Sequence, residues 1–177
     1  MRRIISIVAV IAITVSSLAL LAGSSAYAED LTPDQAEHIK TNCVSIKSSL
    51  NQLHASDALL RVNRGQVYEA MASKLMDTFN DRLSGNRLDN KAMVTVTANY
   101  RSALNDFRTD YIQYEQKLAT ALRTDCTTQP NSFYRILEEA RQLRKDVHAD
   151  VTALHRFIDD YRSSVSSFLL DFERIAE

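Results

Sequence analysis

The chain of 177 residues has few of the residues that build turns: three glycines, two prolines and no tryptophan. A turn-rich β protein of this length would need more glycine and proline. Alanine, leucine, arginine, aspartate and serine are abundant instead. The composition therefore predicts an all-α protein.

The chain also lacks an excess of charge of either sign, with 21 basic and 22 acidic residues. Without Arg2 and Arg3, which precede a long apolar run, the remaining residues carry a net charge of about −3. Attraction to nucleic acid or to anionic lipid requires a basic surface. We therefore expect no nucleic-acid partner.

The one long apolar run lies at the N-terminus. Residues 4–21 follow Met1-Arg2-Arg3, and Ala26-Tyr27-Ala28 supplies the small-x-small pattern that signal peptidase cleaves. We interpret residues 1–28 as a signal peptide, so that the mature chain is exported and is extracellular or periplasmic. The alternative is an uncleaved N-terminal anchor, because about 18 apolar residues approach the length that spans a bilayer. The membrane contact would then be made through residues 4–21 alone.

Residues 29–177 are predicted to form a single helical bundle domain. Thr32, Pro33 and Gln35 combine an N-cap, a first-turn proline and a capping box. Apolar residues then recur in steps of three and four. This pattern is interrupted over residues 54–66, the lapse, and then resumes, which predicts a long helix as far as Ser84. The inward positions are Ala36, Ile39, Cys43, Ile46, Leu50 and Leu53, then Val67, Met71, Leu75, Phe79 and Leu83. Gly85 is predicted to end this helix with a positive φ.

Two further helices are predicted, from about Asn90 to Asp125 and from Phe133 to Ile175, with Pro130 in their connection. The inward positions of the second helix are Met93, Thr97, Tyr100, Leu104, Phe107, Tyr111, Tyr114, Leu118 and Ala121. Those of the third helix are Phe133, Leu137, Ala140, Leu143, Val147, Val151, Leu154, Ile158, Tyr161, Val165, Phe168, Phe172 and Ile175.

Two cysteines in an exported chain predict one disulfide, Cys43–Cys126. Their midpoint falls between Ser84 and Gly85, where the glycine independently predicts a turn. Residues equidistant from the turn of an antiparallel hairpin lie side by side, as a disulfide requires. We therefore predict an elongated antiparallel three-helix bundle, coiled-coil-like and similar in shape to spectrin-type bundles. The alternative is a four-helix up-down bundle in which the first segment breaks near Ser56.

The lapse over residues 54–66 carries the candidate site. Reflection about the predicted turn places Arg61 and Arg64 near Asp106 and Asp110, and the third helix adds Asp146 at the same level. One interpretation is a polar layer that sets the register of the bundle. A second is a ligand or partner site where the backbone comes close at Gly65, and a third is solvent exposure alone.

Other polar residues have simpler interpretations. The tyrosines on inward positions are expected to pack in the core with their hydroxyl groups at its rim. The charged run 141–146 is expected to be a solvated helix face.

Sequence patterns of catalytic sites are missing. The chain has no Glu-x-x-His pair, no His-Glu-x-x-His and no Gly-x-Ser-x-Gly. His148 and His155 would share a helix face, but no adjacent pair of ligands completes a metal site. We therefore expect no catalytic residue, no cofactor and no metal.

Two stretches resemble parts of uncharacterised exported helical proteins of candidate-phylum bacteria. The first is residues 57–83, with Arg61-Val62-Asn63-Arg64-Gly65 and Lys74-Leu75-Met76, and the second is residues 126–134, with Gln129-Pro130 and Phe133-Tyr134. The resemblance implies export and helicity and implies no activity.

These observations predict a non-enzymatic, exported helical scaffold or interaction protein of the cell envelope or exterior. Its partner would be a protein or an envelope component, and a narrow apolar stripe would also permit an oligomer. The alternative is a periplasmic or surface chaperone-like binder that holds apolar clients between its helices.

Overall fold

A computed structural model describes residues 31–176 of the chain. Its elements are α1 (Pro33–Thr41), α2 (Cys43–Ala70), the π-helix η1 (Met71–Met76), α3 (Asp77–Gly85), α4 (Lys91–Arg123) and α5 (Pro130–Ala176). No strand occurs in this range, so the all-α prediction is confirmed. The predicted signal peptide lies outside the described residues. Among the helices of residues 31–176, none is long and apolar enough to cross a membrane.

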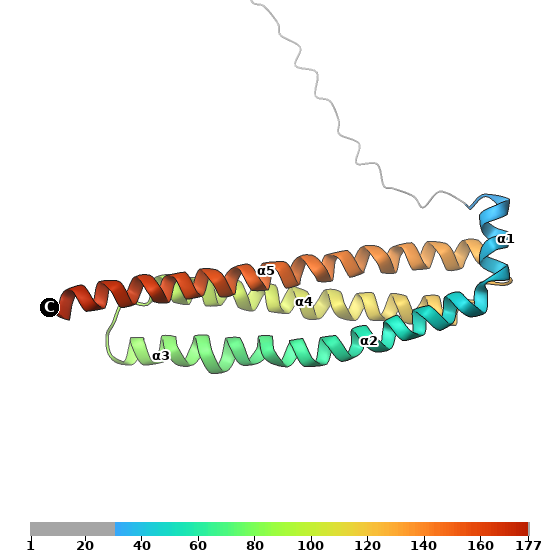
Figure 1. Cartoon of the computed structure of the whole chain (residues 1–177). Helices are drawn as coiled ribbons and strands as arrows, with labels where there is room; N and C mark the ends of the chain where they lie inside the picture. Colours follow the sequence, from blue (N-terminus) through green and yellow to red (C-terminus); the bar gives the residue numbers. More distant parts are fainter. Residues whose placement is uncertain (1–30, 177) are drawn as a thin grey trace, which may run out of the picture.

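Three long rods make up the body of the molecule (Figure 1). The first rod consists of α2, η1 and α3 in succession, and α4 and α5 are the other two. Helices α4 and α5 contact each other along most of their length, whereas the first rod contacts them less extensively. The 47 residues of α5 span about 70 Å at the α-helical rise.

The first helix begins as predicted, but it does not continue into the first rod. The Thr32 hydroxyl accepts from the Gln35 amide at 3.3 Å, and the Gln35 side chain accepts from the Thr32 amide at 2.9 Å. Helix α1 ends at Thr41, and Figure 1 shows it lying across one end of the rods. The chain turns at Asn42, whose side chain donates to the His38 carbonyl at 2.9 Å. Helix α2 then passes Ser56 without a break.

The predicted disulfide is present at this end of the molecule. Cys43 and Cys126 are bonded, with their Cα atoms 5.6 Å apart. Cys43 opens α2, and Cys126 lies in the connection between α4 and α5. Both are buried with Ala121 and Phe133. The bridge therefore fixes the start of the first rod to the junction of the other two.

The turn at the opposite end lies where it was predicted, but a different residue has the positive φ. Gly85 is the last residue of α3, and the positive φ of 57° belongs to Arg87. The Leu88 amide donates to the Leu83 carbonyl at 2.9 Å, and the Arg87 amide donates to the Ser84 carbonyl at 3.0 Å. These two bonds define a Schellman motif, in which the left-handed residue follows the C-cap. Arg87 occupies that position because the cap is Asn86.

The core contains the inward positions predicted for the second helix. All nine of them are buried in α4, together with Ala103. Along α5, Phe133, Ala140, Leu154 and Tyr161 are buried. Phe172 was predicted to face inward and is instead 48% exposed. Figure 1 shows the reason, because the C-terminal end of α5 runs past the turn between α3 and α4.

Between residues 67 and 76 the buried positions of the first rod are shifted by one residue from the prediction, whereas Leu83 is buried as predicted. Tyr68, Ala72 and Met76 are buried, whereas Val67 and Leu75 are more than half exposed. Apolar residues occupy both rows, so the spacing alone does not choose between them. The Tyr68 ring packs edge-on against Phe107, with centroids 5.7 Å apart, and its hydroxyl lies 3.1 Å from His155 Nε2. These contacts select the row that contains Tyr68.

A buried polar cluster joins the rods near the turn. The Asn80 side-chain Nδ2 donates to the Thr97 hydroxyl at 2.9 Å, and the side-chain Oδ1 of Asn80 accepts from the Tyr161 hydroxyl at 3.0 Å. Asn90 donates to the Asn80 backbone carbonyl at 2.8 Å. Burial, followed by the charge of Asp77, raises the pKa of Tyr161 to about 12. Because its members satisfy one another, this cluster can fix the register of the rods.

Candidate functional site

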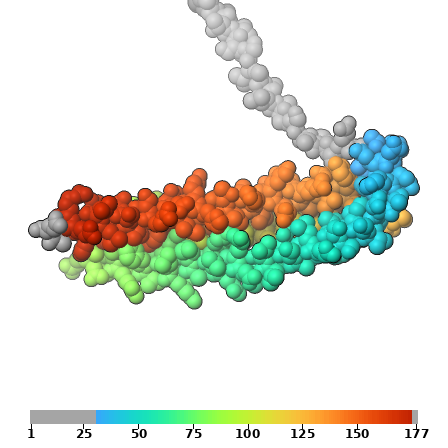
Figure 2. Space-filling view, viewed as in Figure 1, coloured from blue at the N-terminus to red at the C-terminus, as the bar shows by residue number. Residues whose placement is uncertain are grey.

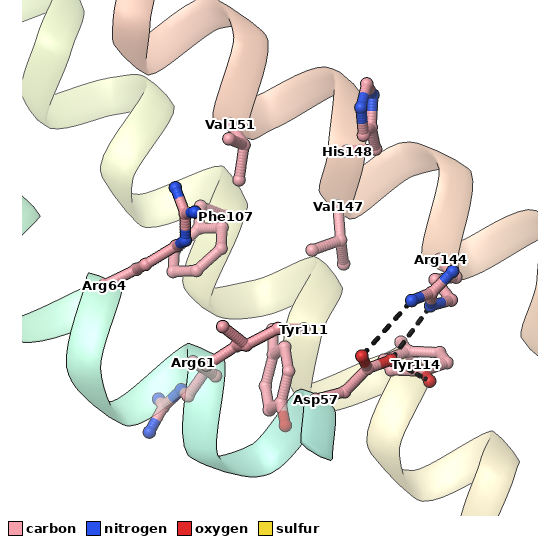
Figure 3. Close-up of a pocket in the computed structure, with 11 residues that line it drawn as sticks. Asp57, Arg61, Arg64, Phe107, Tyr111, Tyr114, Arg144, Val147, His148 and Val151 are labelled. Carbon is pink, nitrogen blue, oxygen red and sulfur yellow. Dashed lines mark hydrogen bonds and ion pairs between the residues drawn. The ribbon is translucent and has the colours of Figure 1, made fainter. Parts of the chain in front are cut away.

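A groove of about 230 Å³ opens midway along the bundle, between α2, α4 and α5 (Figure 3). Helix α4 contributes Phe107, Tyr111 and Tyr114 to its lining. The residues from α2 are Asp57, Leu60, Arg61 and Arg64, and those from α5 are Arg144, Val147, His148 and Val151. The groove thus has an aromatic and aliphatic interior with arginines at its margins.

The groove results from the lapse in the apolar pattern of the first rod. Cys43 and Tyr68 are the buried residues of α2, and no residue between them is buried. Large apolar side chains fill the space between packed helices, and a stretch whose inward positions lack them leaves a gap. Helix α2 is therefore held at both ends and packs loosely between them.

One carboxylate links all three helices at the groove. Asp57 accepts from Arg144 through Nε at 2.9 Å and Nη2 at 3.2 Å, and from the Tyr114 hydroxyl at 2.7 Å. The dashed lines in Figure 3 mark these contacts. Burial favours the neutral acid, but the hydrogen bonds from Arg144 and Tyr114 outweigh it and hold the pKa of Asp57 below its ordinary value. Asp57 is therefore a carboxylate at neutral pH, with its charge compensated.

Arg61 and Arg64 lack such a partner. The guanidinium carbon of Arg61 lies 5.3 Å from the centroid of the Tyr111 ring, a cation–π contact. Arg64 extends from α2 towards the part of the groove that contains Phe107 (Figure 3). Neither arginine forms an ion pair with any of the residues 31–176. Both positive charges are thus free to attract an anion.

The acidic residues predicted to meet these arginines lie elsewhere. Asp106, Asp110 and Asp146 do not line the groove, and they gather with Asp150 along the contact between α4 and α5. We call these four residues the acidic seam. The structure thus places the predicted polar residues in two groups, arginines in the groove and aspartates in the seam.

Asp150 is the most perturbed member of the acidic seam. Burial, followed by the charges of Asp110, Asp106 and Asp146, raises its pKa to about 6. Its buried Oδ2 atom has no hydrogen-bond partner in the part of the chain that the structure describes. The seam therefore opposes ionisation of Asp150, whereas the groove favours ionisation of Asp57.

Gly65 does not mark a close approach of the backbone to another chain segment. A Cβ atom placed on Gly65 would have nothing within 4 Å. Gly65 instead lines a second cleft, of about 540 Å³, between the first rod and α4, next to Arg61. Gly65 therefore lies beside the candidate site on α2 and makes no close contact with another segment.

Three residues of the groove were given other roles or none in the sequence-based prediction. Arg144 falls in the charged run expected to be solvated, and it instead binds Asp57. Tyr111 and Tyr114 were expected in the core with their hydroxyls at its rim, and Tyr114 places its hydroxyl on Asp57. The available signal was Asp57 itself, a charged residue on an inward position of the first rod.

Within residues 31–176, no group of three or more histidine, cysteine, aspartate or glutamate side chains is placed to hold a metal ion. His148 lines the groove, and His155 contacts Tyr68. The chain matches no protein-family model, no curated protein and no solved structure. Its resemblance to exported helical proteins of candidate-phylum bacteria stays a prediction.

Proposed function

We propose that this protein is an exported, non-enzymatic helical scaffold that binds a protein or envelope component through the outer surface of its first rod. The observation that carries the proposal is the exposure of large apolar side chains there. Among residues 31–176, six of the eleven exposed large hydrophobic side chains belong to α2 and η1: Val44, Leu59, Leu60, Val62, Val67 and Leu75. Leu60 lines the groove, and the proposal rests on the other five. Leu59 and Val62 are three residues apart and share one face of α2, and exposed apolar residues that share a face are typical of interaction sites.

The shape and the disulfide support this proposal. The molecule is elongated, and α2 faces solvent along its length in the space-filling view (Figure 2). A long rod offers a partner more continuous surface than a compact fold of equal mass. The Cys43–Cys126 bond is compatible with export, because disulfides persist outside the cytoplasm.

Site-specific photocrosslinking in intact cells tests the proposal. A photoreactive residue in place of Leu59 or Val62 should capture one discrete partner. The same residue in place of Asn99, an exposed polar position on α4, should not capture it. Leu59→Lys should abolish capture from position 62 without changing the melting temperature. Equal capture from positions 62 and 99 would contradict the proposal.

An apolar groove near the turn favours the second candidate, a chaperone-like binder of apolar clients. It lies between the first rod and α5 and is lined by Met71, Leu75, Met76, Phe79, Ile158, Tyr161, Arg162 and Val165. Such a binder should suppress aggregation of an unfolded client protein, and Leu75→Lys should remove the effect. If the protein is a scaffold only, neither the wild type nor the Leu75→Lys variant should suppress aggregation.

A further inference from the structure

We propose that the groove between α2, α4 and α5 binds a small carboxylate with an apolar body, such as a medium-chain fatty acid. This site is distinct from the outer surface of the first rod, so the two proposals can fail separately.

Charge complementarity identifies the polar end of the ligand. Arg61, Arg64 and Arg144 line the groove, and Asp57 is the one acidic residue among the lining residues. Asp57 already accepts from Arg144 and Tyr114, which leaves Arg61 and Arg64 without a carboxylate. A guanidinium group binds a carboxylate through two parallel hydrogen bonds, a geometry that neutral and cationic ligands cannot accept. The groove therefore favours an anion.

The walls of the groove identify the rest of the ligand. Phe107, Tyr111, Val147 and Val151 present aromatic and aliphatic surface next to the arginines. A fully hydrated inorganic anion would gain nothing from such walls, whereas an alkyl or aryl group would be removed from water there. The ligand therefore joins an anionic end to an apolar body.

The size of the groove limits the ligand to a small molecule. Its volume of about 230 Å³ is below the roughly 300–1,000 Å³ of sites for drug-sized ligands. A polyanion is disfavoured for a different reason, because the acidic seam borders the same turns of α4 and α5 and would repel an extended negative charge.

The margins of the groove are already arranged for binding. Asp57, which accepts from Tyr114, also holds the Arg144 side chain, and the Tyr111 ring lies beneath the Arg61 guanidinium. Long side chains lose less conformational entropy on binding when they are held in place beforehand. Arg64 is the exposed member, and it is free to close over a bound carboxylate.

Calorimetric titration of the oxidised full chain with octanoate tests the site. We expect one molecule bound per chain with a Kd below about 1 mM. Octanol and octylammonium match the apolar body without the negative charge, and both should bind at least about tenfold more weakly. Inorganic phosphate supplies the charge alone and should not compete with octanoate.

Matched arginine variants locate the binding. Arg64→Gln and Arg61→Gln should each weaken octanoate about tenfold and leave the affinity for octanol unchanged. Arg82→Gln, at an exposed position of α3 far from the groove, should change neither affinity. Methyl resonances of Val147 and Val151 should shift on addition of octanoate, whereas those of Leu169 and Leu170 should not.

Three results would overturn the inference. The first is equal affinity for octanoate and octanol, and the second is octanoate binding that neither groove arginine affects. The third is the absence of binding at octanoate concentrations of about 10 mM, ten times the upper limit expected for the Kd.

Discussion

Residues 44–67 and residues 68–85 belong to the same rod, yet they contact the rest of the molecule differently. In the second stretch, Tyr68, Ala72, Met76, Asn80 and Leu83 are buried against α4 and α5, whereas the first stretch has no buried residue. Both stretches are helical, so helix formation does not explain the difference. The spacing of large apolar residues does, because packing between rods depends on it. We call these stretches the open half and the packed half.

The two halves also differ in how they are held. The packed half joins a continuous core and a buried polar cluster. The open half is held by the disulfide at one end and by the contacts of Asp57 in its middle. A region with few buried contacts is free to bind ligands and partners at a low cost in stability. The candidate groove accordingly opens beside the open half, which also carries five of the eleven exposed large apolar side chains of residues 31–176.

Removal of the disulfide should have the largest effect. In the chain-entropy model, Cys43→Ser with Cys126→Ser should lower the free energy of unfolding by about 4–5 kcal/mol, because the bridge closes a loop of 83 residues. Denaturant titration measures this loss. Hydrogen exchange should accelerate more in the open half than in the packed half. Equal acceleration in both halves would show that the disulfide does not hold the open half in particular.

A matched pair of truncations tests the packing of the two halves. Met76→Ala in the packed half should cost about 2–5 kcal/mol of stability, because its side chain is fully buried. Leu59→Ala in the open half should cost less than about 0.5 kcal/mol, since its side chain is 64% exposed. Urea denaturation of both variants gives the comparison, and similar losses would contradict the distinction between the halves.

Asp57→Ala should destabilise the open half by about 1–3 kcal/mol, because Arg144 and Tyr114 would lose their shared acceptor. Arg141→Gln is the control, since it removes an exposed pair with Glu138 and should cost less than about 0.5 kcal/mol. The low pKa of Asp57 adds a pH dependence. The stability that Asp57 contributes is fully present above the ordinary pKa of 3.8. It is lost as the pH falls through the lower pKa of Asp57 in the folded state. A wild-type advantage over Asp57→Ala that persists below both pKa values would contradict this.

Asp150→Asn should stabilise the protein by about 1 kcal/mol at pH 7, after allowance for solvent screening. Its pKa of about 6 in the folded state lies above the ordinary 3.8, so ionisation costs stability. The cost grows as the pH rises from about 4 to 6, and it is absent below the ordinary pKa. Thermal unfolding of the variant at pH 3 and pH 7 measures it. Asp159→Asn, at an exposed position paired with Arg162, should give no such gain.

Gly65→Ala should have the smallest effect, a gain of up to about 1 kcal/mol. Alanine is the better helix former, and its Cβ would meet no atom within 4 Å. Thermal unfolding measures the gain. A loss of stability would show that another surface approaches α2 at this residue and would restore the backbone-contact interpretation.

The regular parts of this fold follow from the sequence. All nine inward positions predicted for α4 are buried, and Ala103 alone was missed, because three-four spacing without competing apolar rows leaves one solution. The shift to Tyr68, Ala72 and Met76 was not predictable, since Val67, Met71 and Leu75 form an equally apolar row. The contacts of Tyr68 with Phe107 and His155 decide between the rows, and those contacts are long-range.

The candidate site was predictable in its location but not in its partners. The lapse over residues 54–66 indicated where packing would fail, and the groove opens there. Reflection about the turn assumed a uniform register, and this placed Asp106 and Asp110 within a turn of Arg61 and Arg64. Between these arginines and the turn the rod contains the π-helix at residues 71–76, which changes the register. Small local departures from a straight helix thus redirect side chains far along the rod.

The position of the disulfide also determines how the molecule would transmit mechanical tension. A force applied to the two chain ends would pass from α1 through the two sulfur atoms and directly into α5. The residues between the two cysteines would bear no load, so stretching would unravel α1 and α5 before it extended α2 or α4. Reduction of the bond would then release roughly 280 Å of additional contour length at the extended spacing of a polypeptide.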